Sequence, residues 1–353
     1  MAIDLLTAES SSIASTKARS ASFGGSPADA VAVVGEGQGS GAASIAVATE
    51  AVSTPMTESK GRGEVSPLSD YVQLTKPRIV VMILVTTCAT AMLGAGGLVS
   101  ASDLIWLLFG TAAVAGSAGA ANQIWERVID SRMTRTANRP LPSGRVAFGP
   151  ALLYTAFLGV AGTGLLALKF GTIPAAVGLA TWALYVLVYT PMKTRTAWNT
   201  TVGAVAGAIP VLIGYTALGG SLADATGWLL VGVLVAWQYP HFMSIAWMYR
   251  RQYGEAGFRM TTTEEPTGRS AGWQSIAGSA VLILCGVTLC WLPAGWLPAT
   301  LTSLAVLAAA WPMLMASIRF AKSPDDVRAR KLLRSSLLVL PAVLAVVTLR
   351  LFW

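Results

Sequence analysis

Nine long apolar segments follow one another along the chain from residue 79 to the C-terminus. An α-helix needs about 20 mainly apolar residues to cross the hydrocarbon core of a bilayer, so each segment predicts a membrane-spanning helix. Pro210 predicts a kink in the fifth. The segments cover residues 79–98, 104–124, 149–168, 172–190, 200–219, 227–248, 273–292, 297–317 and 336–352. We therefore expect an all-α, polytopic membrane domain over residues 67–353.

Residues 1–66 have a different composition. This segment is rich in Ser, Ala and Gly, carries scattered charges and shows no sustained apolar periodicity. Such a segment buries too little apolar surface to offset the entropy of ordering it. The sequence predicts a disordered N-terminal tail followed by the membrane domain.

Composition supports a membrane protein and argues against nucleic acid as a partner. The chain is 54% hydrophobic and only 12% charged, whereas soluble domains carry about 25% charged residues. The net charge of +8 lies mostly in short loops between the apolar segments, which is typical of membrane orientation signals. The three cysteines lie inside apolar segments without metal-binding spacing, and His241 is the only histidine. A site that uses several histidines is therefore excluded.

The distribution of basic residues predicts the orientation. Lys and Arg collect before the first segment and in the loops after the second, fourth, sixth and eighth, while the opposite loops near 99–103, 220–226 and 293–296 have none. The positive-inside rule then places the N-terminus and the polar motifs in the cytoplasm and the C-terminus outside. We expect a bacterial inner membrane. A mitochondrial inner membrane, with the same loops in the matrix, is the alternative and depends on the N-terminal tail.

Three oxygen-bearing side chains follow one helix face at the end of the second segment. Asn122, Glu126 and Asp130 are spaced at i, i+4 and i+8, so they point the same way from a helix. Acidic groups at membrane depth are costly and normally face a cavity. Carboxylate and amide oxygens are ligands of hard cations such as Mg²⁺, which commonly bind phosphate groups as well. We interpret the three residues as a metal and diphosphate site.

The following loop is rich in arginine. Arg135 and Arg139 offer planar guanidinium groups suited to phosphate. A structural alternative is that the two acids simply pair with nearby arginines, namely Arg127, Arg132 and Arg135.

A second polar block follows the fourth segment. It contains the cations Lys193 and Arg195, the amide Asn199 and the aromatic Tyr189. All of them are expected on the same membrane face as the acids. Ordinary anchoring at the membrane surface is the alternative interpretation.

A third block lies at the end of the sixth segment. Trp237, Gln238 and His241 are followed by Gln252 and Tyr253. Polar side chains in an apolar helix need polar partners or a cavity. A lone histidine is also compatible with a packing role, and the sequence leaves both interpretations open.

Together the three blocks resemble the protohaem IX farnesyltransferases (haem O synthases), a branch of the UbiA-type intramembrane prenyltransferases, over residues 68–352. The family motif N-x3-E-x3-D followed by R-T-x2-R-P-L-P-x-G matches Asn122 to Gly144, and W-x-x-P-H-F matches Trp237 to Phe242. The block Y-T-x-x-K/L-R-x-T-x-x-N looks like residues 189–199, and A-G-x-x-M matches residues 256–260. The family usually has Asp before the tyrosine that corresponds to Tyr253, where this chain has Gln252.

The resemblance implies a UbiA-type helical bundle that transfers farnesyl from farnesyl diphosphate to a vinyl group of haem B, forming haem O. It implies catalytic roles for Asn122, Glu126, Asp130 and His241. The implied Mg²⁺ ligands are Asn122, Glu126 and Asp130, with Glu255 as a candidate for the missing carboxylate. The implied diphosphate ligands are Arg135, Arg139, Lys193 and Arg195. Residues expected to contact haem or the prenyl chain are Trp125, Tyr189, Asn199, Trp237, Gln238, Gln252 and Tyr253.

Several implications stay open at this point. His241 could orient a haem propionate, ligate iron or manage the terminal proton. A haem A synthase or an oxidase assembly factor is a candidate partner, besides the lipid bilayer. One rival is another UbiA-type enzyme acting on an aromatic acceptor, which Glu126 and the Pro240-His241-Phe242 element disfavour. A secondary transporter is a second rival, disfavoured because no internal repeat is visible and the polar motifs lie on one side.

Overall fold

The computed structural model describes residues 67–292 and 295–352, so the predicted tail over 1–66 lies outside the described residues. In the described ranges the regular structure is helical, and nine helical segments are long and apolar enough to cross a membrane. The prediction of an all-α membrane domain is confirmed. The nine spans are α3 (Pro77–Ala95), α4 (Ala101–Asp130), α5 (Phe148–Phe170), α6 to α7 (Thr172–Met192), α8 and α9 (Asn199–Ala217), α10 (Ala225–Met248), α13 (Arg269–Trp291), α14 (Trp296–Lys322) and α15 (Asp326–Leu349).

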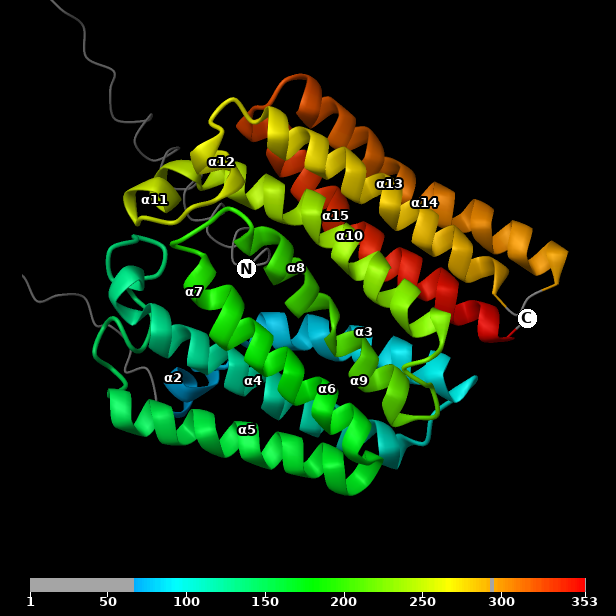
Figure 1. Cartoon of the computed structure of the whole chain (residues 1–353), viewed down its shortest axis with the longest axis horizontal. Coiled ribbons are helices and arrows are strands. Elements are labelled where there is room, and N and C mark those ends of the chain that lie inside the picture. The colour runs from blue at the N-terminus through cyan, green and yellow to red at the C-terminus, as the bar shows by residue number, and fades with distance from the viewer. Residues whose placement is uncertain (1–66, 293–294, 353) are drawn as a thin grey trace, which may run out of the picture. The chain divides into compact units, whose positions relative to one another are not determined.

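The spans pack side by side, each antiparallel to the next (Figure 1). α4 packs against α3 and α5, while α10 packs against α8, α13 and α15. α15 also contacts α3, so the last span returns to the first. Short helices α2 (Pro67–Leu74), α11 (Arg250–Glu255) and α12 (Thr261–Glu264) lie outside the spans, and η2 (Arg350–Phe352) ends the described chain. α11 and α12 lie in the connection between α10 and α13 at one end of the helices.

Two spans contain breaks that matter for the site. The fourth span consists of α6 (Thr172–Ala183), a π-helical segment η1 (Leu184–Tyr189) and the short α7 (Thr190–Met192). The fifth is divided at Ile209 into α8 (Asn199–Ala208) and α9 (Pro210–Ala217), at the position where the sequence predicts a kink. Pro210 lacks the N–H that a continuous helix would use, which explains the break.

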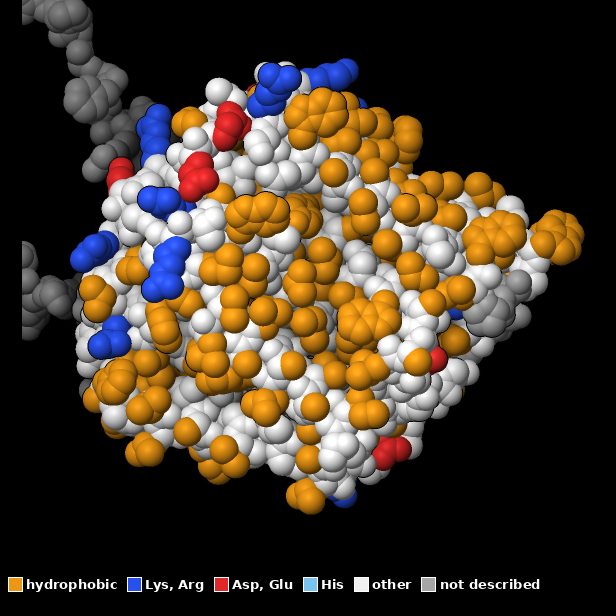
Figure 2. Space-filling model, in the orientation of Figure 1, with side chains coloured by type: hydrophobic (Ala, Val, Ile, Leu, Met, Phe, Trp, Pro, Cys, Tyr) orange, Lys and Arg blue, Asp and Glu red, His pale blue; other side chains and the backbone are white. Residues whose placement is uncertain are grey.

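The outer surface of the spans is apolar. Large side chains such as Phe157, Leu168 and Leu338 are at least 69% exposed, and a field of hydrophobic side chains fills most of the face shown in Figure 2. An exposed apolar surface of this extent is expected where lipid, rather than water, surrounds the protein. Most of the Lys and Arg side chains visible there gather at one end of the helices.

Candidate active site

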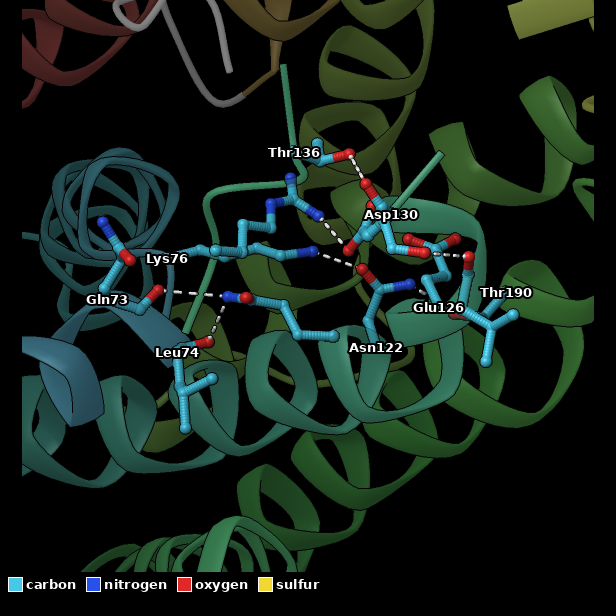
Figure 3. A network of polar contacts seen from close by, with 12 residues as sticks. Gln73, Leu74, Lys76, Asn122, Glu126, Asp130, Thr136 and Thr190 are labelled. Atoms are coloured by element: carbon cyan, nitrogen blue, oxygen red, sulfur yellow. Dashed lines mark hydrogen bonds and ion pairs between the residues drawn. The ribbon is translucent and has the colours of Figure 1, made fainter. Parts of the chain in front are cut away.

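The three oxygen-bearing residues of α4 form the centre of a buried polar cluster (Figure 3). Asn122, Glu126 and Asp130 are at most 5% exposed, and they lie on the part of α4 that faces α3 and α7. The prediction that they share a helix face is confirmed by this arrangement. Their metal-binding role stays a prediction.

Each of these side chains is paired with a basic residue from a different segment. Lys76, just before α3, donates a hydrogen bond from Nζ to Asn122 Oδ1. Lys193, just after α7, lies 2.7 Å from Glu126 Oε1, and Arg139 lies 2.6 Å from Asp130 Oδ2. The acids therefore pair with two predicted diphosphate ligands. They do not form ion pairs with Arg127, Arg132 or Arg135 in the described part of the chain.

The position of Lys76 is fixed by the connection between α2 and α3. Gln123 of α4 donates from Nε2 to the carbonyls of Gln73 and Leu74, at 3.1 and 3.0 Å. A Cβ on Gly119 would lie 2.9 Å from the Thr75 carbonyl oxygen, so this connection can approach α4 only where α4 has a glycine. Lys76 itself has φ 56°, which is unfavourable for a residue with a side chain. The contacts around it hold that conformation and direct its amine into the cluster.

Hydrogen bonds also join the second and third sequence blocks to the first. The Arg259 N–H donates to the Lys193 carbonyl at 2.8 Å, and Asn199 Nδ2 donates to the Arg259 carbonyl at 2.6 Å. Asn122 Nδ2 donates to Thr190 Oγ1 at 3.0 Å. Asn199 is therefore seen in a bridging role between the two loops. The structure brings all three motif regions together at one end of the bundle.

The cluster changes the acid–base properties of its lysines. Burial, followed by repulsion from Arg139 and Lys193, lowers the pKa of Lys76 to about 7. Burial alone would lower the pKa of Lys193, but attraction to Glu126 and to the tyrosines Tyr189 and Tyr185 outweighs burial and raises that pKa. Lys193 is thus a permanent cation, while Lys76 titrates close to neutral pH.

The pKa of Lys76 predicts a pH-dependent stability for the metal-free protein. Because folding lowers this pKa from 10.5 to about 7, folding is penalised while the amine is protonated, and the penalty decreases as pH rises from about 7 towards 10.5. We expect the free energy of unfolding in EDTA to rise by roughly 2 kcal/mol between about pH 7 and 9. Lys193 stays protonated in both states over this range and adds no slope.

Thermal unfolding in detergent across this pH range measures the effect. The Lys76→Met variant should lose most of the slope, because it has no amine to titrate. A slope of the same size in Lys76→Met would assign the pH dependence to another group.

The polar residues of α10 are bonded to neighbouring helices. His241 Nδ1 lies 2.9 Å from Ser336 Oγ of α15, and its ring stacks on Trp237 at 4.8 Å between centroids. Trp237 Nε1 donates to the Ser336 carbonyl at 2.6 Å, and Gln238 Nε2 donates to the Ala204 carbonyl of α8 at 2.9 Å. Among the described residues, His241 has no hydrogen bond or ion pair with the acids of α4. Trp237, His241 and Ser336 form a second polar centre between α10 and α15, while Gln238 connects α10 to α8.

The remaining predicted site residues differ in their surroundings. Tyr189 lies beside Lys193, whose Nζ is 4.6 Å from the ring centroid. Arg135 lies over the Tyr249 ring, with Cζ 5.5 Å from the ring centroid. Tyr253 is buried next to Phe258. Both Tyr249 and Tyr253 belong to the α10–α11 region, so Arg135 faces the third block.

Four predicted residues lie at the margin of this arrangement. Trp125 is 54% exposed on α4, and Arg195 and Glu255 are also exposed. Gln252 is half-buried, and its buried Oε1 has no hydrogen-bond partner among the described residues. The structure does not bring Trp125, Arg195 or Glu255 into the described contacts of the acid cluster.

Sequence reasoning missed the contribution of Lys76 and Thr190. In the sequence Lys76 counts only as an orientation signal, although a lysine directly before Pro77 at the start of a span is also positioned to reach inward. Thr190 sits inside the second motif, next to Tyr189. Its hydroxyl accepts from Asn122 and donates to the Tyr185 carbonyl at 2.8 Å, which requires the π-helical turn that no hydropathy pattern reveals.

Comparison with known proteins gives consistent matches across the membrane domain. Residues 83–338 match the UbiA prenyltransferase family. A protein from Rhodopirellula baltica named protoheme IX farnesyltransferase is 61% identical over 283 residues, covering 79% of this chain and 99% of that relative. One of the same name from Solibacter usitatus is 39% identical over 300 residues, covering 78% of this chain and 96% of that relative.

A solved structure shares the fold. The UbiA homologue from Archaeoglobus fulgidus bound to GPP and Mg²⁺ has a TM-score of 0.60 at 15% identity, covering 79% of this chain and 99% of that chain. At this identity the likeness concerns the arrangement of helices. Together with the family match over residues 83–338 and the 61% identical relative, it shows that this chain belongs to the UbiA prenyltransferase family.

Proposed function

We propose that this protein transfers the farnesyl group of farnesyl diphosphate to a vinyl group of haem B, forming haem O for haem–copper oxidases. The name of the 61% identical relative supports the choice of substrates. The observation that carries the chemistry is the buried cluster of two carboxylates, one amide and three basic side chains at one end of the bundle. Such a cluster suits the metal complex of a diphosphate, because its oxygen atoms can bind the metal and its cations can bind the phosphates.

The donor set of α4 fits Mg²⁺. Asn122, Glu126 and Asp130 present amide and carboxylate oxygens from one buried helix face, and Mg²⁺ is usually held by one or two carboxylates together with phosphate oxygens. When bound, Mg²⁺ would neutralise part of the diphosphate charge and so favour departure of the leaving group. Gln252, with its unpartnered Oε1, is a candidate for a weaker contact opposite α4. Glu255 stays a candidate carboxylate that is exposed in this structure.

Substrate binding would exchange the partners inside the cluster. Without ligand, Lys193 and Arg139 neutralise Glu126 and Asp130. A metal-bound diphosphate offers positive charge to the acids and negative charge to the cations, so each ion pair could open without leaving a buried charge alone. Lys193, Arg139 and Lys76 would then hold the phosphate oxygens, and their charge would stabilise the departing diphosphate. Arg135 and Arg195 are further candidates at the edge.

The acceptor side involves the second polar centre. The bond from His241 Nδ1 to Ser336 fixes the orientation of the imidazole and leaves Nε2 as the other ring nitrogen that could meet a haem propionate or iron. Trp237 stacks on the same ring, and Tyr189 lies beside Lys193. Their aromatic faces could shield an allylic cation. A haem A synthase or oxidase assembly factor remains the candidate recipient of the product.

The orientation that we propose rests on the charges at the two ends of the helices. The cluster lies at the end where Lys76, Lys193, Arg250 and Arg269 flank the spans. We propose that this end faces the cytoplasm of a bacterial inner membrane, in agreement with the positive-inside rule.

Metal removal and product analysis test the proposed reaction. Purified protein with haem B, farnesyl diphosphate and Mg²⁺ should yield a farnesylhydroxyethyl haem detectable by mass spectrometry of extracted haems. EDTA should abolish the product and added Mg²⁺ should restore it. Product that forms equally well in EDTA would contradict the metal assignment. Unchanged haem together with prenylation of 4-hydroxybenzoate would contradict the choice of acceptor.

A further inference from the structure

A hollow lies between the ends of α13 and α14, outside the active-site cluster. It has a volume of about 570 Å³ and is bordered by Arg269 at the start of α13 and Lys322 at the end of α14. Arg250 lies 2.9 Å from Asp326 and so links α11 to the start of α15. Because α13 begins directly after α11 and α12, the hollow lies at the same end of the helices as the active-site cluster.

The lining of the hollow is amphipathic. Trp273, Ile276 and Ile318 lie further along the two spans and form an apolar wall beneath the cations. Trp273 is 61% exposed. Tryptophan is enriched at the level where the hydrocarbon core of a membrane meets the headgroups. The order of cation, tryptophan and isoleucine along the helices follows the order of headgroup, interface and acyl chain in a lipid.

The two cations of the hollow lack acidic partners. Neither Arg269 nor Lys322 forms an ion pair among the residues that the structure describes, and both side chains are exposed. Three acids on the adjoining connections have other partners. Asp325 pairs with Arg328, Asp326 pairs with Arg250, and Glu265 accepts hydrogen bonds from the N–H groups of Thr267 and Ser270. An anion in the hollow would therefore meet two exposed cations that have no direct acidic partner among the described residues.

Two residues that line the hollow, Ala321 and Pro324, pack closely against glycines. A Cβ on Gly272 would lie 2.5 Å from Ala321 Cα, so α13 and α14 touch almost backbone to backbone at this level. Gly268, with φ +77°, would place a Cβ 2.8 Å from Pro324. The shape of the hollow therefore does not depend on flexible side chains at these two contacts.

A second, smaller hollow lies between α14 and α15. It has a volume of about 270 Å³ and is lined by Arg319, Arg328 and Lys331. From residue 319 to 334 the chain has six basic residues and two acidic ones. The second hollow adds positive charge around the end of α14 and strengthens attraction for an anionic headgroup.

We infer that the hollow between α13 and α14 binds an anionic phospholipid, with its phosphate at Arg269 and Lys322 and its acyl chain along Trp273, Ile276 and Ile318. Basic pockets between spans at this membrane level are suited to such headgroups. The inference does not depend on the prenyl-transfer reaction. It assigns a lipid site to a region that the reaction does not use.

Native mass spectrometry of the full chain in detergent tests the inference. Phosphatidylglycerol is titrated against the wild type, the R269Q/K322Q variant, and R132Q as a control that removes an exposed cation of the loop after α4. We expect the double change to weaken binding of phosphatidylglycerol by about tenfold, with the control unchanged. Unchanged affinity in the double variant would overturn the inference.

Two further measurements distinguish a lipid headgroup from a soluble anion as the ligand of the hollow. Ile276→Trp fills the hollow without changing charge and should also weaken phosphatidylglycerol binding, with thermal unfolding used to verify folding of each variant. Phosphatidylcholine should bind more weakly than phosphatidylglycerol, and inorganic phosphate should not displace the lipid. Equal binding of phosphatidylcholine would show a purely apolar groove, and displacement by phosphate would show a site for soluble anions. Either result would overturn the assignment.

Discussion

Replacement of Asp130 by Asn is expected to reduce haem O formation roughly 100- to 1,000-fold, a loss of about 3–4 kcal/mol of transition-state stabilisation. The asparagine would keep the size of the side chain but lose the negative charge that we propose for Mg²⁺ binding. The protein should remain folded, because the partner Arg139 is 24% exposed and water can solvate its guanidinium group. The expected cost in stability is about 1 kcal/mol.

The measurement compares product formation per folded protein in detergent at saturating haem B and farnesyl diphosphate. Asp326→Asn is the matched control, because it removes a carboxylate from an exposed ion pair with Arg250 at the same membrane face. That variant should retain activity. If raising the Mg²⁺ concentration leaves Asp130→Asn inactive while metal affinity is normal, Asp130 acts on the diphosphate in another way. Normal haem O formation by Asp130→Asn would remove it from the site.

The sequence was sufficient for the number of spans and for their order. Hydropathy locates only the lipid-facing or buried apolar part of a helix, so it places the end of the second span at 124 and the start of the ninth at 336. The structure continues α4 to Asp130 and begins α15 at Asp326. The added turns are polar on one face, yet they bury residues such as Ala329 and Leu332. Tertiary packing sustains helical structure where hydropathy no longer indicates it.

The placement of the clustered side chains could be predicted where residues repeat along one helix, but not where distant segments meet. The spacing of Asn122, Glu126 and Asp130 is enough to place them together on α4. Their partners depend on how α3 and α7 pack against α4. No periodic pattern in a single sequence indicates that packing. The ion pair from Lys193 to Glu126 joins residues 67 positions apart. Lys76 enters the cluster only because its left-handed backbone turns the chain before α3.

The ion pair of Lys193 and Glu126 gives the second large expected effect. Lys193→Met should destabilise the metal-free protein by about 3 kcal/mol, because the Glu126 side chain is only 7% exposed and would lose its nearest cation. Adding Glu126→Gln to the same chain should recover most of that loss, since a neutral amide needs no counter-charge. Turnover should stay lost in the single and the double variant. Thermal unfolding in EDTA and product analysis measure the two quantities separately.

Magnesium should distinguish this ion pair from an ordinary structural one. If Glu126 is a metal ligand, Mg²⁺ can replace the missing ammonium, so it should stabilise Lys193→Met more than the wild type. The Lys193→Met/Glu126→Gln variant should respond least, because it lacks the carboxylate. Equal stabilisation of all three proteins would show that Glu126 does not bind the metal. A double variant as unstable as the sum of the single changes would show that the two charges are not coupled in the folded protein. In the reaction that we propose, the same acids serve two successive partners, their own cations before substrate arrives and the metal afterwards.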